Sequence, residues 1–221
     1  ADAVASTSHV MAEQVRRVFQ YQKPIFITPF GVDCNLFSPK NQPKKDGFCV
    51  GIVKALEDCY GIEYLIEAFA IAVKKLPASL SPRLEIYGKG SRQEYLQQLI
   101  DQKGLSAQAK LCGAIPNTEV PYAISQMDVF CLSSVSESFG VSAVEAMACC
   151  VPVIATNADG FREVVDDGVT GYLVPARDPV AMADRICELA LNPELREHFG
   201  QNGRERVLSL YNFSKNVDSM E

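Results

Sequence analysis

The chain has 221 residues, of which 48% are hydrophobic and 22% charged, a composition typical of a soluble globular protein with a substantial core. Its formal net charge of −6 argues against broad affinity for nucleic acids or anionic membranes. The two histidines, His9 and His198, are far apart in the sequence, which argues against a histidine-based metal site or a Ser-His-Asp triad.

The chain begins with a predicted helix and strand that stand apart from the later pattern. Ser8 can cap a helix in which Met11 and Val15 share one face, and residues 24–28 are predicted to form a strand. Residues 29–47 combine turn-forming residues with a polar linker. One helix and one strand have no core of their own. They therefore belong to a domain outside this chain or pack onto the domain that begins at residue 48.

From residue 48 onwards, short apolar strands alternate with helices. The predicted strands cover residues 48–53, 83–87, 109–112, 127–132, 152–155 and 171–174. The predicted helices cover residues 61–76, 91–103, 117–125, 141–148, a short segment near 161–166, and two helices through 179–209. This alternation predicts right-handed βαβ crossovers and an α/β fold with a doubly wound parallel sheet. Ligands of such sheets bind beyond the carboxyl ends of the strands.

The eight cysteines show no C-x-x-C spacing, and several fall in predicted strands or in the buried helix. There, cysteine behaves as a small apolar residue, which indicates a reducing compartment rather than a disulfide framework. No apolar run approaches about 18 residues, so no membrane-spanning helix is predicted. The N-terminus lacks the profile of a signal peptide.

Residues 133–156 are the most informative stretch. Serines and Gly140 connect a buried strand to a helix that is apolar on most sides, so the N–H groups at the helix start can receive a phosphate or another electron-rich group. Two carboxylates, Glu137 and Glu145, are separated by seven residues. The neighbours of Glu145 three and four positions away cannot neutralise it, and an unpaired buried carboxylate is costly. Glu145 therefore lies either on a narrow solvated stripe or against the hydroxyl groups of a ligand.

Three further loops follow the ends of predicted strands. The first carries Lys54 and Tyr60, and Lys54 on its own has the pattern of a solvated surface lysine. The second, residues 87–91, contains Gly-Lys-Gly but lacks the third glycine and the later acidic residue of a dinucleotide site, which argues against NAD. The third, residues 112–116, includes Ile115 and needs no ligand, because Gly and Pro form turns by themselves.

The segment from Glu137 to Glu145, Glu-Ser-Phe-Gly-Val-Ser-Ala-Val-Glu, resembles the E-x7-E signature of retaining glycosyltransferases of the GT-B fold, family 4 type. The flanking sequences Asp128-Val-Phe, Glu145-Ala-Met-Ala and Val151-Pro-Val-Ile-Ala-Thr match the surroundings of that signature, and the similarity extends across most of the chain. The resemblance implies that this is the Rossmann-like C-terminal half of such an enzyme.

On this interpretation the chain has three parts. Residues 1–28 are the tail end of the N-terminal acceptor domain, residues 29–47 are the interdomain linker, and residues 48–221 bind the nucleotide-sugar donor. Because the N-terminal domain is missing, the isolated chain should transfer sugar negligibly. The tail from residue 211 onwards should lack its docking surface.

The resemblance also implies roles for individual residues. Glu137 contacts the donor sugar and, with Lys54, is a catalytic candidate, whereas Glu145 holds the ribose hydroxyls. The backbone around Gly140 lies against the sugar and the diphosphate. The remaining donor-binding candidates are Gly88, Ile115, Ser138, Phe139, Gly140, Val141 and Tyr60.

Two regions depart from the family pattern. Lys54 stands where the family usually has Arg, and Tyr60 stands where it has Lys, so one of the two cations that clamp the diphosphate is missing. Asp159 precedes Gly160 where the family has two glycines. We expect Glu163 in the first turn of the following helix, where the helix dipole favours a carboxylate.

By the same resemblance, the expected function is transfer of a sugar from a UDP- or GDP-linked donor to a polysaccharide or glycolipid acceptor, with no metal or other cofactor. Two alternatives are a GT-B-like sugar-nucleotide epimerase and a non-catalytic nucleotide-sugar-binding module. The family also suggests a role in bacterial cell-wall or cell-surface polysaccharide synthesis, in the cytosol or on the inner face of the membrane.

Overall fold

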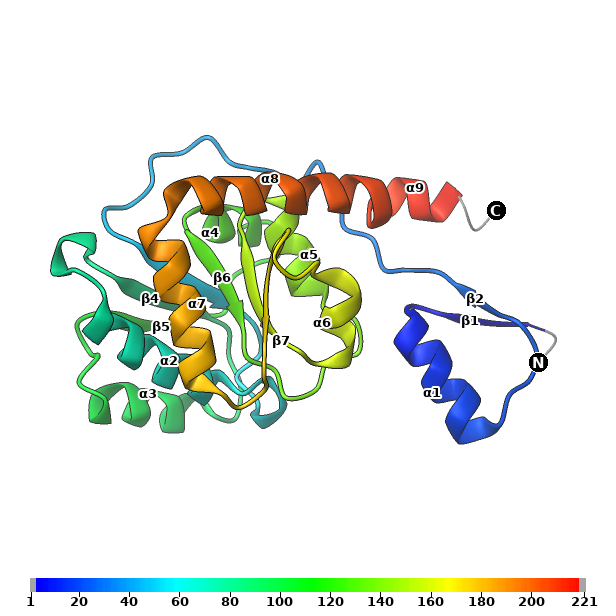
Figure 1. Ribbon diagram of the computed structural model, residues 1–221, viewed down its shortest axis with the longest axis horizontal. Coiled ribbons are helices and arrows are strands. Elements are labelled where there is room, and N and C mark those ends of the chain that lie inside the picture. Colours follow the sequence, from blue (N-terminus) through cyan, green and yellow to red (C-terminus); the bar gives the residue numbers. More distant parts are fainter. Residues whose placement is uncertain (1–2, 219–221) are drawn as a thin grey trace.

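The computed structural model describes residues 3–218 and has a six-stranded parallel sheet at its centre (Figure 1). The strands are β3 (Cys49–Val53), β4 (Arg83–Tyr87), β5 (Ala109–Gly113), β6 (Val129–Leu132), β7 (Val153–Thr156) and β8 (Gly171–Val174). Their spatial order is β5-β4-β3-β6-β7-β8, and every neighbouring pair is parallel. The predicted doubly wound α/β sheet is therefore confirmed.

Helices pack on both faces of this sheet. One group consists of α2 (Ile62–Lys75), α3 (Gln93–Gln102) and α7 (Pro179–Leu191). The other consists of α4 (Val120–Ser125), α5 (Val141–Ala148) and α8 (Pro193–Leu210), with the short α6 (Asp159–Val164) against α5. Two 3-10 turns, η1 (Asp58–Tyr60) and η2 (Ala78–Leu80), complete the connections. The predicted helices of this region are confirmed as elements, although α4 is shorter than expected and α6 begins earlier.

The core fills both sides of the sheet. All residues of β6 and β7 are buried, and the largest fully buried side chains include Phe69, Phe130 and Phe161. Helix α5 contacts β6 and β7 on one side and α8 on another. A helix enclosed in this way has little solvated surface, which explains why its sequence is apolar around most of its circumference.

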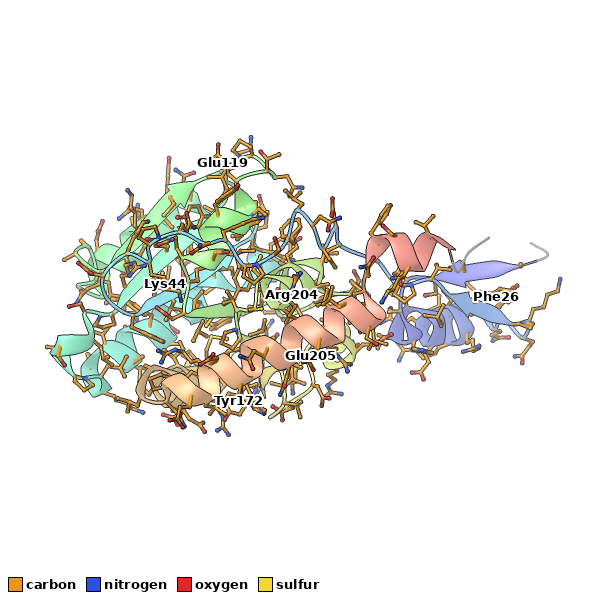
Figure 2. All side chains as sticks on the ribbon, turned by 90° about the horizontal axis from the view of Figure 1, so that it is seen from above. Phe26, Lys44, Glu119, Tyr172, Arg204 and Glu205 are labelled. Carbon is orange, nitrogen blue, oxygen red and sulfur yellow. The ribbon has the colours of Figure 1, made fainter. Side chains whose placement is uncertain are left out.

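Residues 3–28 form a small unit at one end of the molecule (Figure 1). It consists of β1 (Val4–Ser6), α1 (His9–Phe19) and β2 (Ile25–Ile27), and the two strands pair in parallel. The sequence predicted only a helix and a strand here and missed β1. Helix α1 faces α6 of the main body, whereas Figure 2 shows Phe26 near the outer end of the unit.

The C-terminal helix α9 (Phe213–Asp218) packs on the segment that leaves this small unit. The Phe213 N–H donates to the Val32 carbonyl at 3.1 Å, and the Asn216 side-chain amide donates to the Pro29 carbonyl at 3.2 Å. The expectation that the tail lacks a docking surface is therefore wrong for residues 211–218. Residues 219–221 lie outside the described part.

Within residues 3–218, every helix is too short or too polar to cross a membrane. All eight cysteines are free, and four of them (Cys34, Cys49, Cys131 and Cys149) are buried. The prediction that cysteine serves here largely as a small apolar residue agrees with this burial.

Candidate functional site

The carboxyl ends of β3 and β6 meet at the centre of the sheet. These strands are neighbours, but the chain continues from β3 towards β4 and from β6 towards β7, in opposite directions across the sheet. A crevice forms at such a switch point, and ligands of open α/β sheets bind there. The loops that follow the two strands join across it, because the Val135 N–H donates to the Cys59 carbonyl at 2.9 Å and the Ser133 hydroxyl donates to the Tyr60 carbonyl at 3.1 Å.

Lys54 and Glu137 form an ion pair at this switch point. Lys54 Nζ lies 2.8 Å from Glu137 Oε2, and the two side chains are only 15% and 12% exposed. The Tyr60 ring faces the same ammonium group, with its centroid 4.4 Å from Nζ. The structure thus brings together three residues that the sequence singled out. Tyr60 supplies no second cation and instead contributes a cation–π contact to Lys54.

Glu145 lies on α5 within the electrostatic influence of the same lysine. Burial raises the pKa of its carboxyl group to about 7, while the charge of Lys54 acts in the opposite direction. Glu145 is partly buried, and its carboxyl group keeps some contact with solvent. A ligand that offers hydroxyl groups would supply hydrogen bonds that this environment provides only in part.

Helix α5 starts immediately beyond Gly140, which has a φ of +101°. A Cβ atom at Gly140 would lie 2.8 Å from the Phe161 ring, so both the backbone conformation and the available space require glycine. Val141, the first helical residue, is 39% exposed. The first N–H groups of a helix have no acceptor inside it, so this helix start can bind an anion near Lys54.

The backbone of the loop that carries Glu137 is held by α6 and by aromatic packing. The Gly160 N–H donates to the Glu137 carbonyl at 2.9 Å, and a Cβ atom at Gly160 would lie 2.4 Å from the Phe139 nitrogen. The buried Phe139 ring makes edge-to-face contacts with Phe30 and Tyr211, with centroids 5.4 and 5.7 Å away. The Phe139 side chain is thus part of the core, and only its backbone is available to a ligand.

Helix α1 is attached to the same loop and to α6. The Ser8 hydroxyl donates to the Ser138 carbonyl at 3.4 Å. The Glu163 carboxylate accepts the backbone N–H groups of His9 at 3.0 Å and Val10 at 3.3 Å, at the start of α1. The prediction for Glu163 was wrong: it lies in the last turn of α6, because that helix starts earlier than expected, and it caps α1 instead of its own helix.

The loop after β4 packs against the loop after β3. The Lys54 N–H donates to the Tyr87 carbonyl at 2.9 Å, and a Cβ atom at Gly88 would lie only 1.9 Å from the Lys54 carbonyl oxygen. Gly88 therefore allows the close approach of the two backbones. Ile115, in the connection after β5, is half-buried against the core.

Glu57, in the loop after β3, contacts the end of the loop formed by residues 88–91. Its carboxylate accepts the Ser91 N–H at 3.0 Å and also the Ser91 hydroxyl. A carboxylate of the neighbouring loop thus takes up the N–H and the hydroxyl group of Ser91. Groups of three or more His, Cys, Asp or Glu side chains that could hold a metal ion do not occur in the described ranges.

Sequence reasoning missed Ser8, Glu163 and Glu57 as parts of this region. Each acts through contacts with segments remote in the chain, and no local pattern marks such contacts. The one available signal was the position of Ser8 before a predicted helix, which indicated a cap but not its second contact with the Ser138 carbonyl.

Comparison with known proteins agrees with this geometry. The sequence profile of the family "Glycosyl transferases group 1" matches residues 35–206. The protein EpsD of Bacillus subtilis (strain 168) is 35% identical over 156 residues, which cover 71% of this chain and 39% of EpsD. The chain therefore spans well under two thirds of that relative.

Two solved structures are similar over almost the whole chain. Sucrose-phosphate synthase from Thermosynechococcus elongatus superposes with a TM-score of 0.89 at 29% identity, covering 100% of this chain and 57% of that one. A mutant of S. aureus TarM, in complex with fondaparinux, alpha-GlcNAc-glycerol and UDP, has a TM-score of 0.83 at 25% identity and covers 99% and 43%. The chain thus belongs to the group 1 family of glycosyl transferases and has the Rossmann-like fold of GT-B enzymes.

Proposed function

We propose that this chain is the donor-binding part of a glycosyltransferase, and that a nucleotide-sugar binds at the carboxyl ends of β3 and β6. The observation that carries the proposal is the convergence of Lys54, Glu137 and Glu145 beside the start of α5. A cation, a helix N-terminus and two carboxylates complement a diphosphate with hydroxyl-bearing groups at either end.

In this proposal each of the three side chains has a separate role. Lys54 and the first N–H groups of α5 balance the charge of the diphosphate, without a bound metal ion. Glu145 accepts hydrogen bonds from the ribose hydroxyls, and Glu137 contacts the donor sugar. The backbone from Ser138 to Val141 lies along the donor, Gly88 lies near the nucleotide, Ile115 lies near the base, and Tyr60 holds Lys54 in position.

The pairing of Lys54 with Glu137 bears on how the donor enters. The Lys54 side chain is only 15% exposed, so a diphosphate can approach it with little further desolvation of the lysine. The diphosphate then competes with Glu137 for Lys54. The carboxylate becomes available to the sugar as the phosphate takes the lysine.

The reaction that we propose retains the configuration of the sugar. The bond between the anomeric carbon and the diphosphate oxygen breaks, and a bond from an acceptor oxygen forms on the same face of the sugar. The acceptor proton passes to the leaving phosphate. The acceptor, a polysaccharide or a glycolipid, is bound mainly by a further domain, so that this chain on its own transfers sugar negligibly.

Calorimetric titration of the chain with UDP, GDP and ADP, with NAD as the control, tests the binding step. UDP is the first choice because the similar TarM structure is a complex with UDP. We expect one of the nucleoside diphosphates to bind, with the same affinity in the presence of EDTA, and NAD not to bind. Lys54→Met should weaken this binding, whereas Lys74→Met, which removes an exposed lysine near the end of α2, should not. A lack of binding by all three nucleotides at millimolar concentration would contradict the proposal.

A further inference from the structure

A cavity of about 300 Å³ lies at the amino ends of β6 and β7, at the opposite end of the strands from the Lys54–Glu137 pair. It is formed by segments far apart in the sequence, namely the linker between the small unit and β3, the residues that enter β6 and β7, the end of α5 and the first turn of α8. Figure 1 shows the linker and α8 along this side of the sheet. The charged side chains of the lining are Lys40, Lys44, Asp128, Arg196 and Glu197.

One of the two carboxylates in this lining is fully engaged. Asp128 Oδ1 lies 2.9 Å from Lys44 Nζ, and Asp128 Oδ2 accepts the Cys49 N–H at 2.8 Å. Lys44 also donates to the Met127 carbonyl at 3.3 Å. The charges of Lys44 and Asp128 therefore balance each other, and this pair leaves no charge over for a ligand.

Two further cations of the lining, Lys40 and Arg196, are half-buried. Lys40 Nζ donates to the Ser38 hydroxyl at 3.1 Å and lies 5.4 Å from the centroid of the Tyr122 ring. The Arg196 guanidinium donates to two backbone carbonyls at the end of α7. In the described part of the chain, neither side chain forms an ion pair with a carboxylate. A cation that has lost part of its water without gaining a counter-charge would be stabilised by an anion in this cavity.

The charge of Lys40 acts on the wall of the cavity that the end of α5 forms. Burial raises the pKa of the Cys149 thiol to about 12, and the nearby charge of Lys40 opposes this rise. The end of a helix can repel an anion, because its last carbonyl groups carry partial negative charge. Here these carbonyls are already occupied by hydrogen bonds from the N–H groups of residues 149–151 and from the Arg204 guanidinium. The end of α5 therefore opposes an anion only weakly.

Glu197 is the second carboxylate of the lining, but it is exposed and accepts the Gln201 side-chain amide at 3.2 Å. Water screens an exposed charge, so Glu197 reduces the attraction of an anion to Lys40 and Arg196 without cancelling it. The backbone of the walls is restricted by three prolines, Pro39, Pro152 and Pro193. The volume is at the lower end of the range for small-molecule sites and leaves room for a small substituent on a phosphate group.

We propose that this cavity binds a phosphate group, either as free phosphate or as the phosphate ester of a small metabolite. Phosphate carries close to two negative charges at neutral pH, which Lys40 and Arg196 together balance. A carboxylate carries one charge and leaves one of the two cations uncompensated. Because Lys40 belongs to the linker and Arg196 to α8, the bound phosphate also holds the linker against the main body. The site is separate from the donor site, and the inference does not depend on the proposed function.

The test titrates the ¹⁵N-labelled chain with inorganic phosphate at constant ionic strength and follows the backbone amide NMR signals. The signals of Lys40, Cys150 and Arg196 report on the cavity. Val141, at the donor end of α5, and Gln98, on α3, are the controls. We expect saturable shifts at the cavity signals, with or without a separate transition at Val141, and none at Gln98. Shifts confined to Val141 would place the phosphate at the donor site and refute the inference, and so would an absence of shifts at tens of millimolar phosphate.

Three further compounds define the chemistry of the ligand. Glycerol 3-phosphate contains the phosphate group in an ester, whereas glycerol lacks the phosphate and acetate offers a single carboxylate. We expect glycerol 3-phosphate to shift the cavity signals, acetate to bind at least about tenfold more weakly than phosphate, and glycerol not to bind. The tighter ligand of phosphate and glycerol 3-phosphate identifies free phosphate or an ester as the natural occupant. Acetate binding as tight as phosphate binding would overturn the proposal.

Two charge variants, one with an expected loss and one with an expected gain, test the cavity residues. Lys40→Gln should weaken phosphate binding at least about tenfold, because it removes a charged donor. Glu197→Gln removes the exposed carboxylate and should tighten binding about twofold to fivefold, a gain that misfolding cannot produce. The matched controls, Lys74→Gln at the end of α2 and Glu194→Gln in the first turn of α8 but outside the lining, should bind phosphate nearly as the original chain does. Unchanged affinity in Lys40→Gln, or an equal gain in both glutamate variants, would contradict the inference.

Hydrogen exchange of the full chain tests whether the ligand holds the linker. The Gln42 N–H donates to the Lys40 carbonyl at 2.9 Å, so its exchange rate reports on the order of this part of the linker. Phosphate should slow this exchange at least about threefold in the original chain and leave it unchanged in Lys40→Gln. Phosphate binding at the cavity without slower exchange of Gln42 would overturn the role of the linker.

Discussion

Replacing Glu145 by Gln should stabilise the protein above pH 7 and leave its stability at pH 4 nearly unchanged. The pKa of this carboxyl is raised from 4.5 to about 7, chiefly by burial. In the unfolded chain the group ionises near pH 4.5, so between pH 4.5 and 7 the folded state holds a proton that the unfolded state has released. The free energy of unfolding therefore falls by about 3 kcal/mol as pH rises through this window, because each tenfold change in an ionisation constant corresponds to about 1.4 kcal/mol.

The glutamine variant cannot ionise and should escape this loss. Urea unfolding at pH 4 and pH 8, followed by circular dichroism, gives the free energy of unfolding of both proteins. The difference between variant and original protein should be near zero at pH 4 and should approach 3 kcal/mol in favour of the variant at pH 8. Comparing differences removes the contribution of the other titrating groups.

Glu137→Gln is the matched control, because Glu137 is paired with Lys54 at 2.8 Å. Its removal leaves a half-buried lysine without its partner, so this variant should lose stability at pH 8. If Glu145→Gln were no more stable than the original protein at pH 8, burial would not be destabilising the carboxylate, and the reasoning would be wrong.

The same group links stability to ligand binding. An ionised carboxylate is a stronger acceptor for hydroxyl groups than a protonated one, so UDP affinity should rise between pH 6 and pH 8. Glu145→Gln should weaken UDP binding at pH 8 by about 1.5–3 kcal/mol, the typical value of hydrogen bonds to a charged group. If Glu145→Gln were more stable than the original protein at pH 8 and bound UDP with the same affinity, Glu145 would have no role in the donor site.

Three further substitutions test the contacts around the site. Glu163→Ala should speed hydrogen exchange at the start of α1 by an amount equivalent to about 1–2 kcal/mol, while the central strands stay protected. The control Glu13→Ala, on the exposed side of α1, should leave the exchange rates at the start of α1 unchanged. Gly88→Ala should destabilise the protein by about 2–4 kcal/mol in urea unfolding, because the new Cβ atom would clash with the Lys54 carbonyl. Gly104 also has a positive φ but has open space around it, so Gly104→Ala should cost only about 1 kcal/mol. Lys54→Arg should retain UDP binding in calorimetry, since guanidinium also pairs with phosphate, and a loss as large as that of Lys54→Met would contradict a role in charge balance.

The architecture of the main body was predictable from local sequence patterns. Strands that alternate with helices allow few topologies other than a doubly wound parallel sheet, and that sheet places the loops after residues 53, 87 and 132 at one edge. The apolar circumference of residues 141–148 required a helix buried on most sides, and α5 is such a helix. These features depend on periodicity and burial, which are properties of short segments.

Which side chains meet was not predictable in this way, because the partners come from segments far apart in the chain. Lys54 and Glu137 are 83 residues apart, and Glu163 lies 154 residues from the N–H of His9 that it caps. Strand β1 was not predictable, because three residues become a strand only where a partner such as β2 lies beside them. The local pattern of a chain encodes which faces are buried. The partner of a given carboxylate depends instead on how separate elements pack, and a shift of two residues, as at the start of α6, is enough to change it.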